Sequence, residues 1–410
     1  MFVADVIIGA RSCSLVMYPY RFVIVAALVA AVAFPCVSQA APKSAPAAAV
    51  PQPAPAIAAP TIAASAYLLL DFSSGAVIVA HNADERRDPA SLTKLMTAYL
   101  TFAALKEGKI MPSQSVPVSA AAWHAEGSRM FIEPRRAVSV DELMRGMIVQ
   151  SGNDASIALA EQIAGSETAF VAQMNAEAKR MGLANTNFVN ATGLSQPNHY
   201  SSARDLGTLA AAVIRDFPDY YALYSLKEFR YNNITQPNRN RLLWVDPYVD
   251  GMKTGHTEAA GWCLIGSAKR GERRQIAVVL GAASDAARAN EAEKLLDYGF
   301  QAFDTVHLYH SGETVQSLRV WKGADNNVAA GFFADQYLTL PKGKAAALQL
   351  TMTASEPLLA PIVQGQRVGS VKVALEGKTL AELPMVALAD VPTANIFGRA
   401  WDTMRLWFSR

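Results

Sequence analysis

Ser91 and Lys94 stand three positions apart, and this pair could supply a nucleophile and its base without a histidine. A serine hydroxyl is a weak nucleophile at neutral pH, so a neighbouring group must accept its proton as it attacks a carbonyl carbon. A lysine amine can do this when it is neutral, and both burial and a nearby second cation lower the pKa of a lysine. We expect Lys94 to be the general base and Lys253 to be that second cation.

The residues around this pair predict a helix that carries it. Asp88 can cap a helix, and Pro89 fits a first helical turn. Apolar side chains then recur at helical spacing, namely Leu92, Leu95, Met96 and Leu100. Ser91 is therefore expected in the first turn, with Lys94 on the same face of the helix.

A second short motif, Ser151-Gly152-Asn153, falls between two helical patterns at 143–148 and 157–163. On a tight turn facing a cleft, Ser151 could relay a proton between the two lysines and a leaving amine, while the Asn153 amide could hold Lys94 and the substrate backbone. The alternative is an ordinary interhelical turn, because serine, glycine and asparagine are all favoured in turns.

The third motif, Lys253-Thr254-Gly255, precedes a predicted strand at 261–268, whose antiparallel neighbour is predicted at 276–280. A strand edge beside the nucleophile can bind an extended peptide through main-chain hydrogen bonds, and a glycine allows close approach. Lys253 and Thr254 would then face the negatively charged end of the substrate. The backbone N–H groups of Ser91 and His256 are the candidates for an oxyanion hole.

Five stretches that contain these motifs, residues 88–94, 150–155, 200–205, 238–240 and 250–257, resemble the serine-type D-alanyl-D-alanine carboxypeptidases, which are low-molecular-mass penicillin-binding proteins of type 5. The resemblance runs from about residue 66 to the C-terminus. It implies that Arg204 and Arg288 line the cleft and that His256 helps to bind substrate.

The activity implied by the resemblance is hydrolysis of the terminal D-Ala-D-Ala bond of peptidoglycan stem pentapeptides. Ser91 would form an acyl-enzyme with the penultimate D-alanine, which water then hydrolyses. β-Lactam antibiotics present a similar amide and carboxylate, so they should acylate Ser91 as well.

Two folded domains are expected. Residues 65–304 should form an α/β (α+β) catalytic domain of the serine β-lactamase/transpeptidase type, beginning with a hairpin at 66–80 that turns at 73–75 and ending with a helix at 291–303. Residues 305–393 should form a small all-β sandwich, with strands predicted at 337–340 and 371–375.

The N-terminal residues indicate export. Residues 1–40 combine arginines, an apolar run and a small-residue cleavage site, which is typical of a secretory signal peptide. Residues 41–64 are rich in alanine and proline, a composition that predicts a linker. After cleavage only Cys263 would remain, so no intramolecular disulfide is expected.

Composition excludes some classes of partner. The formal net charge of +2 is too small to indicate the strongly basic surface that binds nucleic acid. The six histidines show no ligand spacing, so neither a metal nor an organic cofactor is predicted.

The tail, residues 394–410, is predicted to be an amphipathic helix that holds the enzyme on the periplasmic face of the inner membrane. The apolar side chains of Phe397, Trp401, Met404 and Phe408 recur at helical spacing. Polar residues and arginines lie between them. So short and charged a segment cannot span a bilayer. The alternative is a terminal helix packed on the β-domain.

Three other functions stay open. A class A β-lactamase would need a glutamate that activates water; Glu228 has a superficially suitable pattern but lies close before Lys253 rather than midway between the second and third motifs. A D,D-endopeptidase acting on crosslinks would use the same residues. A non-catalytic wall-binding protein is disfavoured because all the polar groups of the mechanism are present.

Overall fold

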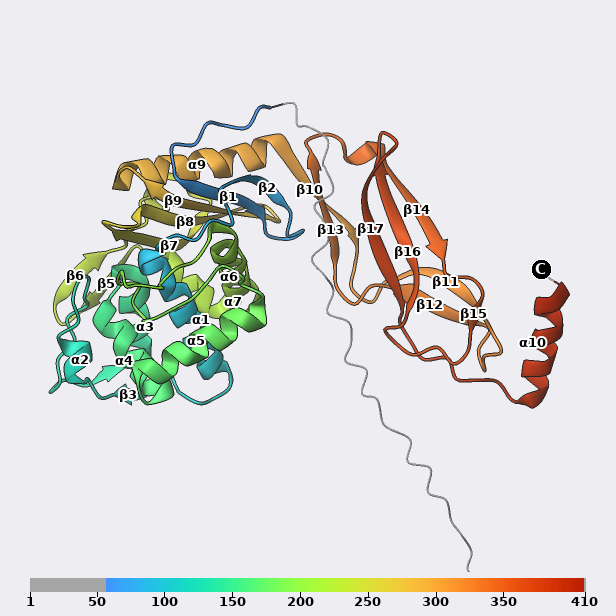
Figure 1. Cartoon of the computed structure of the whole chain (residues 1–410), viewed down its shortest axis with the longest axis horizontal. Helices are drawn as coiled ribbons and strands as arrows, with labels where there is room; N and C mark the ends of the chain where they lie inside the picture. The colour runs from blue at the N-terminus through green and yellow to red at the C-terminus, as the bar shows by residue number, and fades with distance from the viewer. Residues whose placement is uncertain (1–56, 409–410) are drawn as a thin grey trace, which may run out of the picture. The chain divides into compact units, whose positions relative to one another are not determined.

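The computed structural model describes residues 57–408 (Figure 1). The predicted signal peptide, residues 1–40, lies outside the described residues, as does most of the predicted linker at 41–64. Among the described helices, none is both long and apolar enough to cross a membrane.

A five-stranded antiparallel sheet forms the centre of the catalytic region, in the order β2-β1-β9-β8-β7. Its strands are β1 (Ala66–Asp71), β2 (Val77–His81), β7 (Val249–Thr257), β8 (Gly261–Arg270) and β9 (Arg273–Ala282). The predicted hairpin is present, with Gly75 at a φ of 70° in its turn. β7 is an edge strand, so one side of its backbone is not paired within this sheet.

The sheet separates two hydrophobic cores. Because side chains alternate along a strand, Leu68 and Val278 enter one core, while their neighbours Leu69 and Val279 enter the other. Helix α9 (Asp285–Ala302) covers the second face. It starts six residues before the predicted position, because Ser284 caps it by accepting a hydrogen bond from the Ala287 N–H at 3.1 Å.

The other face carries the larger, mainly helical core. Its helices and short strands are α1 (Lys94–Lys106), α2 (Ala120–Trp123), α3 (Val140–Arg145), α4 (Asn153–Ala164), α5 (Glu167–Met181), α6 (Ala203–Asp216), α7 (Pro218–Tyr221), β3 (Ser115–Val116) and β4 (Val138–Ser139). The hairpin of β5 (Glu228–Tyr231) and β6 (Ile234–Pro237) and the short helix α8 (Leu242–Val245) precede β7.

Apart from a 3₁₀ turn, Ala345–Ala347, the C-terminal region is all-β until its last helix, as predicted. A two-stranded sheet pairs β10 (Phe303–Tyr309) with β13 (Gln336–Pro341). A six-stranded sheet contains β11 (Thr314–Trp321), β12 (Asn327–Gly331), β14 (Leu348–Ala354), β15 (Leu358–Leu359), β16 (Arg367–Leu375) and β17 (Lys378–Ala387). The predicted amphipathic tail is helix α10 (Ile396–Phe408).

Candidate active site

Ser91 lies in a 3₁₀ turn, Ala90–Thr93, directly before α1. The Asp88 carboxylate accepts a hydrogen bond from the Ala90 N–H at 2.7 Å, and Ala90 adopts a left-handed φ of 46°. In a 3₁₀ turn the side chains of residues i and i+3 eclipse one another. This geometry sets Lys94 beside Ser91, and the Lys94 Nζ lies 3.0 Å from the Ser91 Oγ.

Lys94 is buried and has two further acceptors, the Asn153 Oδ1 at 2.7 Å and the backbone carbonyl of Thr192. Burial and, after it, the nearby charge of Arg239 lower the pKa of Lys94 to about 7, although Asp154 acts in the opposite direction. A neutral amine has two N–H groups and one lone pair. Donation to Asn153 and Thr192 leaves the lone pair for the Ser91 hydroxyl proton, which is the arrangement that a general base requires.

The Thr192 carbonyl can reach Lys94 because the following residue is glycine. Gly193 has a φ of 83°, and a Cβ on it would lie 1.9 Å from the Ala90 carbonyl oxygen. The Asn190 Oδ1 accepts hydrogen bonds from the N–H groups of Thr192 and Gly193, at 3.1 and 2.7 Å. A side chain at Gly193 would therefore push this loop away from the nucleophile turn.

Ser151 and Asn153 lie where a π-helical turn, Gly146–Gln150, meets α4. Asn153 opens α4, and its side-chain NH₂ donates to the Glu126 carbonyl at 2.6 Å, which directs its oxygen toward Lys94. Ser151 has a left-handed φ of 65°. Its buried hydroxyl has no hydrogen-bond partner within residues 57–408, so it is available to a substrate group.

The third motif lies on β7, against the nucleophile turn. A Cβ on Gly255 would lie 3.2 Å from the Ser91 backbone nitrogen, so a side chain here would press on the nucleophile turn. Lys253 and Thr254 are buried, and the Lys253 Nζ donates to the Thr254 carbonyl at 3.0 Å. Burial holds the pKa of Lys253 well below its usual range, and Lys94 is the next cause.

Two charges act on these lysines besides burial. The mutual repulsion of Lys94 and Lys253 lowers the pKa of Lys253, and Arg239, which was not expected in this role, lowers the pKa of Lys94. Because an arginine stays protonated at all ordinary pH values, Arg239 exerts this effect whether or not Lys253 is charged.

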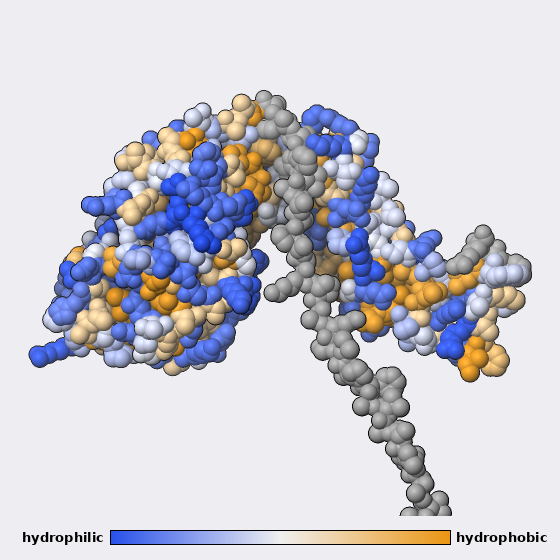
Figure 2. Space-filling model, in the orientation of Figure 1, coloured by the Kyte–Doolittle hydropathy of each residue, from blue (hydrophilic) through white to orange (hydrophobic). Residues whose placement is uncertain are grey.

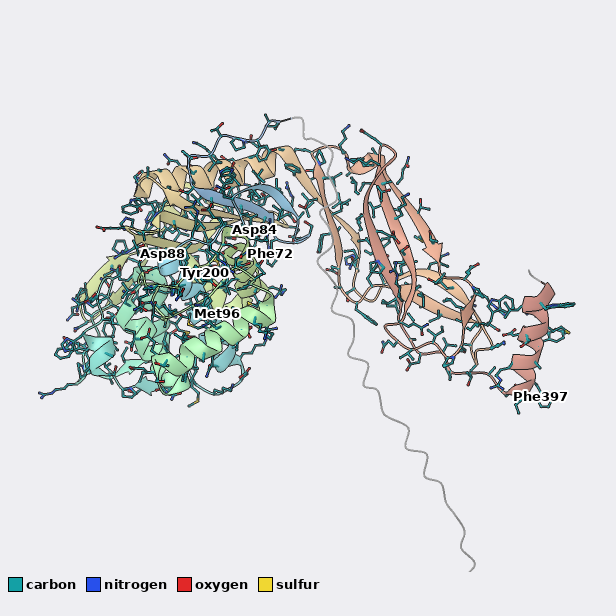
Figure 3. All side chains as sticks on the ribbon, viewed as in Figure 1. Phe72, Asp84, Asp88, Met96, Tyr200 and Phe397 are labelled. Atoms are coloured by element: carbon teal, nitrogen blue, oxygen red, sulfur yellow. The ribbon has the colours of Figure 1, made fainter. Side chains whose placement is uncertain are left out.

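The two arginines implied by the resemblance have different surroundings. Arg288 is buried in the first turn of α9, donates to the Gly255 carbonyl at 3.0 Å, and lies over the Trp262 ring at 5.0 Å. The structure does not bring Arg204 to the cleft. Its guanidinium forms an exposed ion pair with Asp84 at 2.7 Å (Asp84 is labelled in Figure 3).

A cleft of about 460 Å³ joins the motifs. Residues that line it include Ser91, Ser151, Arg239, Thr254, Gly255 and His256. His256 is exposed, and its ring lies 3.9 Å from the Trp262 ring between centroids, inclined by 32°. Arg239 was not predicted as a site residue; the available signal was its place in the stretch 238–240. In the described part of the chain, no hydrogen bond or ion pair engages the Arg239 side chain, so it is free to meet an anion.

Comparison with known proteins agrees with this geometry. The family model described as D-alanyl-D-alanine carboxypeptidase matches residues 53–284. The chain belongs to this family of serine peptidases. A second model, the C-terminal domain of penicillin-binding protein 5, matches residues 303–393. The predicted family, fold and enzyme class are thereby confirmed.

Relatives of this carboxypeptidase match over most of their length. D-alanyl-D-alanine carboxypeptidase DacC of Escherichia coli is 44% identical over 85% of this chain and 89% of that protein. The crystal structure of penicillin-binding protein 5 from Haemophilus influenzae covers 82% of this chain and 99% of its own, with 44% identity and a TM-score of 0.80. Penicillin-binding protein D2 of Listeria monocytogenes in its ampicillin-bound form shares 30% identity, covers 60% of this chain and 100% of its own, and has a TM-score of 0.55.

Proposed function

We propose that this carboxypeptidase removes the terminal D-alanine from peptidoglycan stem pentapeptides through an acyl-enzyme on Ser91. The observation that carries the proposal is the contact between Ser91 Oγ and Lys94 Nζ. The amine donates its two N–H groups to Asn153 and Thr192, so its lone pair is left for the hydroxyl proton of Ser91. The names of the relatives support the choice of substrate.

The reaction has two steps. Ser91 Oγ attacks the carbonyl carbon of the penultimate D-alanine as its proton passes to Lys94, and the developing oxyanion is held by the backbone N–H groups of Ser91 and His256. The C–N bond then breaks, and the leaving amine takes a proton that Ser151 relays. Water hydrolyses the resulting ester, which frees Ser91 and leaves a stem shortened by one residue.

Substrate binding follows from the open edge of β7 and the charges around it. An extended peptide can pair with the backbone beside Gly255 and His256. The carboxylate of the last D-alanine would meet Thr254 and Arg239, and its negative charge would raise the pKa of the nearby Lys253. Arg288 also lines the cleft, and it supports this site because it donates to the carbonyls of Gly255 and Cys263.

Within residues 57–408, no glutamate lines the cleft to activate water, as the β-lactamase alternative would require. Glu228 is exposed at the start of the β5–β6 hairpin and is not among the cleft-lining residues. We therefore expect penicillins to acylate Ser91 and to be hydrolysed slowly. The endopeptidase alternative uses the same chemistry on a crosslinked substrate and differs only in what the cleft accepts.

The test uses a pentapeptide stem, a crosslinked stem dimer and benzylpenicillin, with products identified by mass. We expect the enzyme to release one D-alanine from the pentapeptide. The Ser91→Ala variant should lose this activity and should no longer be labelled covalently by penicillin. Preferential cleavage of the dimer would favour the endopeptidase, and rapid multiple turnover of benzylpenicillin would favour the lactamase.

We also propose that residues 65–304 and 305–393 are separate domains, which the limits of the two family models support.

We further propose a periplasmic enzyme held on the inner membrane by its tail. In α10 the apolar side chains of Phe397, Trp401 and Trp407 are exposed (58% or more; Phe397 is labelled in Figure 3, and Figure 2 shows hydrophobic surface at this end).

Polar residues of α10 contact the β-domain. Asp402 is buried, accepts a hydrogen bond from the Lys322 N–H at 2.6 Å, and lies 3.6 Å from the Arg319 guanidinium. The alternative, a terminal helix packed on the β-domain, would make the same contacts. A docked helix with an outward apolar face is suited to an interfacial membrane contact.

A further inference from the structure

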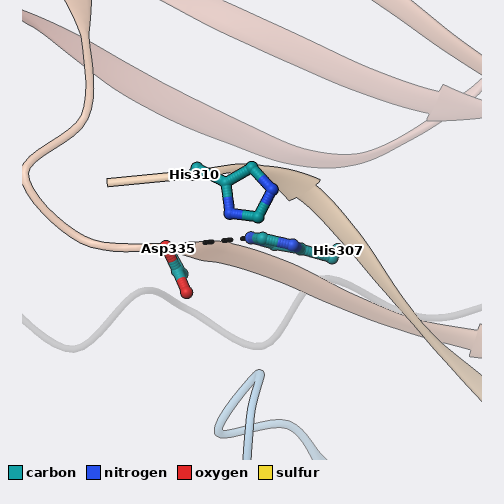
Figure 4. A group of neighbouring side chains, drawn as sticks. All are labelled: His307, His310 and Asp335. Atoms are coloured by element: carbon teal, nitrogen blue, oxygen red, sulfur yellow. Dashed lines mark ion pairs between the residues drawn. The ribbon is translucent and has the colours of Figure 1, made fainter. Parts of the chain in front are cut away.

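Two histidines and an aspartate outside the catalytic cleft lie together at one end of the β10–β13 ribbon (Figure 4). His307 is in β10, His310 follows that strand, and Asp335 directly precedes β13. Each offers one ligand atom, and these atoms all lie within 4.8 Å of one another. None of the three lines the cleft that contains Ser91.

A strand irregularity creates this cluster. In a regular strand, residues three apart point to opposite faces. The pairing of β10 with β13 shifts register between His307 and Tyr309, and such a bulge re-aims the side chains that follow it. The two imidazole rings thus meet at 4.1 Å between centroids, inclined by 88°.

The ligand nitrogen of His307 is not engaged by a hydrogen bond in the described part of the chain. This atom, Nε2, is buried. Its distance to the Asp335 Oδ1 is 3.8 Å, which is longer than a hydrogen bond but short enough for both atoms to reach a common ion after small side-chain rotations.

Neighbouring groups hold the ligands in place. The Ser311 N–H donates to Asp335 Oδ1 at 2.8 Å, and the ring of Tyr337 stacks on His307 at 4.5 Å between centroids, inclined by 19°. The Glu313 carboxylate accepts a hydrogen bond from the His310 backbone N–H at 2.9 Å, which fixes the turn. Such outer contacts orient the ligands of known metal sites.

We propose that His307, His310 and Asp335 bind one divalent transition-metal ion. Two imidazole nitrogens and one carboxylate oxygen suit Zn²⁺, Co²⁺, Ni²⁺ or Cu²⁺ rather than Ca²⁺ or Mg²⁺, which prefer oxygen ligands. Water would complete the coordination. The ion would tie the end of β10 to the start of β13 and so stabilise the β-domain, without entering the peptidase reaction.

The test uses tag-free protein freed of metal by a chelator and titrated with Zn²⁺ by calorimetry, with Co²⁺ as a spectroscopic probe. We expect about one Zn²⁺ per chain, Co²⁺ absorption bands typical of low coordination number, and a rise in Tm on adding Zn²⁺. His310→Gln and Asp335→Asn should each weaken binding by at least about tenfold. His81→Gln, which changes an exposed histidine outside the cluster, should bind Zn²⁺ as the unchanged protein does.

The Tm of the metal-free variants separates ligand loss from unfolding, because exposed ligands should be replaceable with little change in the apo Tm. Absence of stoichiometric binding in the unchanged protein would overturn the proposal. So would equal Zn²⁺ affinity in all three variants, because binding would then be adventitious.

Discussion

Lys94 must be neutral to take a proton from Ser91, and its surroundings favour the neutral amine. Removal from water disfavours the ammonium form, and the fixed charge of Arg239 repels it. Asn153 and Thr192 accept from the amine without supplying a full negative charge. Lys94 is thus a base that works near neutral pH, whereas an exposed lysine would be protonated there.

Because the pKa of Lys94 is about 7, the acylation rate should rise with pH through the neutral range. Below that pH Lys94 is protonated, so the rate of penicillin acylation should fall by about tenfold for each pH unit, and above it the rate should level off. Arg239→Gln removes a repulsive charge, so the pKa of Lys94 should rise and the midpoint of the rate profile should move to higher pH.

The matched control is Arg241→Gln, because Arg241 is an exposed neighbour whose pairing with Asp285 is long, at 4.0 Å. Stopped-flow measurement of acylation by a chromogenic or fluorescent β-lactam gives both profiles. An unchanged midpoint in Arg239→Gln, or the same shift in both variants, would remove Arg239 from this role.

At the scale of elements, the first turn of α4 organises one wall of the cleft. The buried Asp154 carboxylate accepts hydrogen bonds from the backbone N–H groups of Met130, Phe131 and Ile132, at 3.0, 2.8 and 3.2 Å. The adjacent Asn153 contacts Lys94 and, through its N–H, the Ser128 carbonyl at 2.7 Å. The loop at 128–132 and the general base are thus held by consecutive residues.

Asp154→Asn should loosen this wall. One carboxylate oxygen becomes an NH₂ group that faces N–H donors, so the free energy of unfolding should fall by about 1–3 kcal/mol and substrate should bind more weakly. Asp154 also raises the pKa of Lys94, so its neutralisation should move the acylation midpoint to lower pH, opposite to Arg239→Gln.

Asp141→Asn provides the comparison, because Asp141 only pairs with Arg145 on the exposed side of α3 and should change stability by less than about 1 kcal/mol. Chemical denaturation and acylation kinetics measure both effects. Equal loss of stability in the two variants would show that the loop does not depend on Asp154.

At the scale of the whole molecule, the chain combines a buried catalytic apparatus with an outward apolar surface on α10. Two hydrophobic cores, one on each face of the sheet, support the motif residues, whereas α10 lies outside both cores and contacts the β-domain through residues that include Asp402 and Arg405. Removal of α10 should therefore leave the peptidase intact.

Truncation after Thr393 should abolish co-sedimentation with vesicles of anionic phospholipid and leave the rate on a small peptide nearly unchanged. Phe397→Glu together with Trp401→Glu should act in the same way, because both side chains would meet the lipid interface. Leu350→Glu is the control, since Leu350 is an exposed apolar residue on β14 instead of α10. Vesicle binding by the truncated protein, or its loss in Leu350→Glu, would contradict the anchor.

The sequence by itself determined the chemistry and most of the elements. The three motifs name the nucleophile, the base and the substrate strand, because the reaction tolerates few other residue types at those spacings. Local periodicity predicted the hairpin at 66–80, the strands at 261–268 and 276–280, and the tail helix, since each depends on neighbours in the chain.

Only the tertiary structure decided which distant side chains meet. Arg239 reaches the cleft and Arg204 does not, although both lie in stretches that resemble the family. His307 and His310 meet because of a β-bulge that the sequence pattern does not predict. Asp335 joins them from the residue before β13. These contacts depend on how whole elements pack and pair, and long-range packing leaves no repeating pattern in the sequence of any one segment.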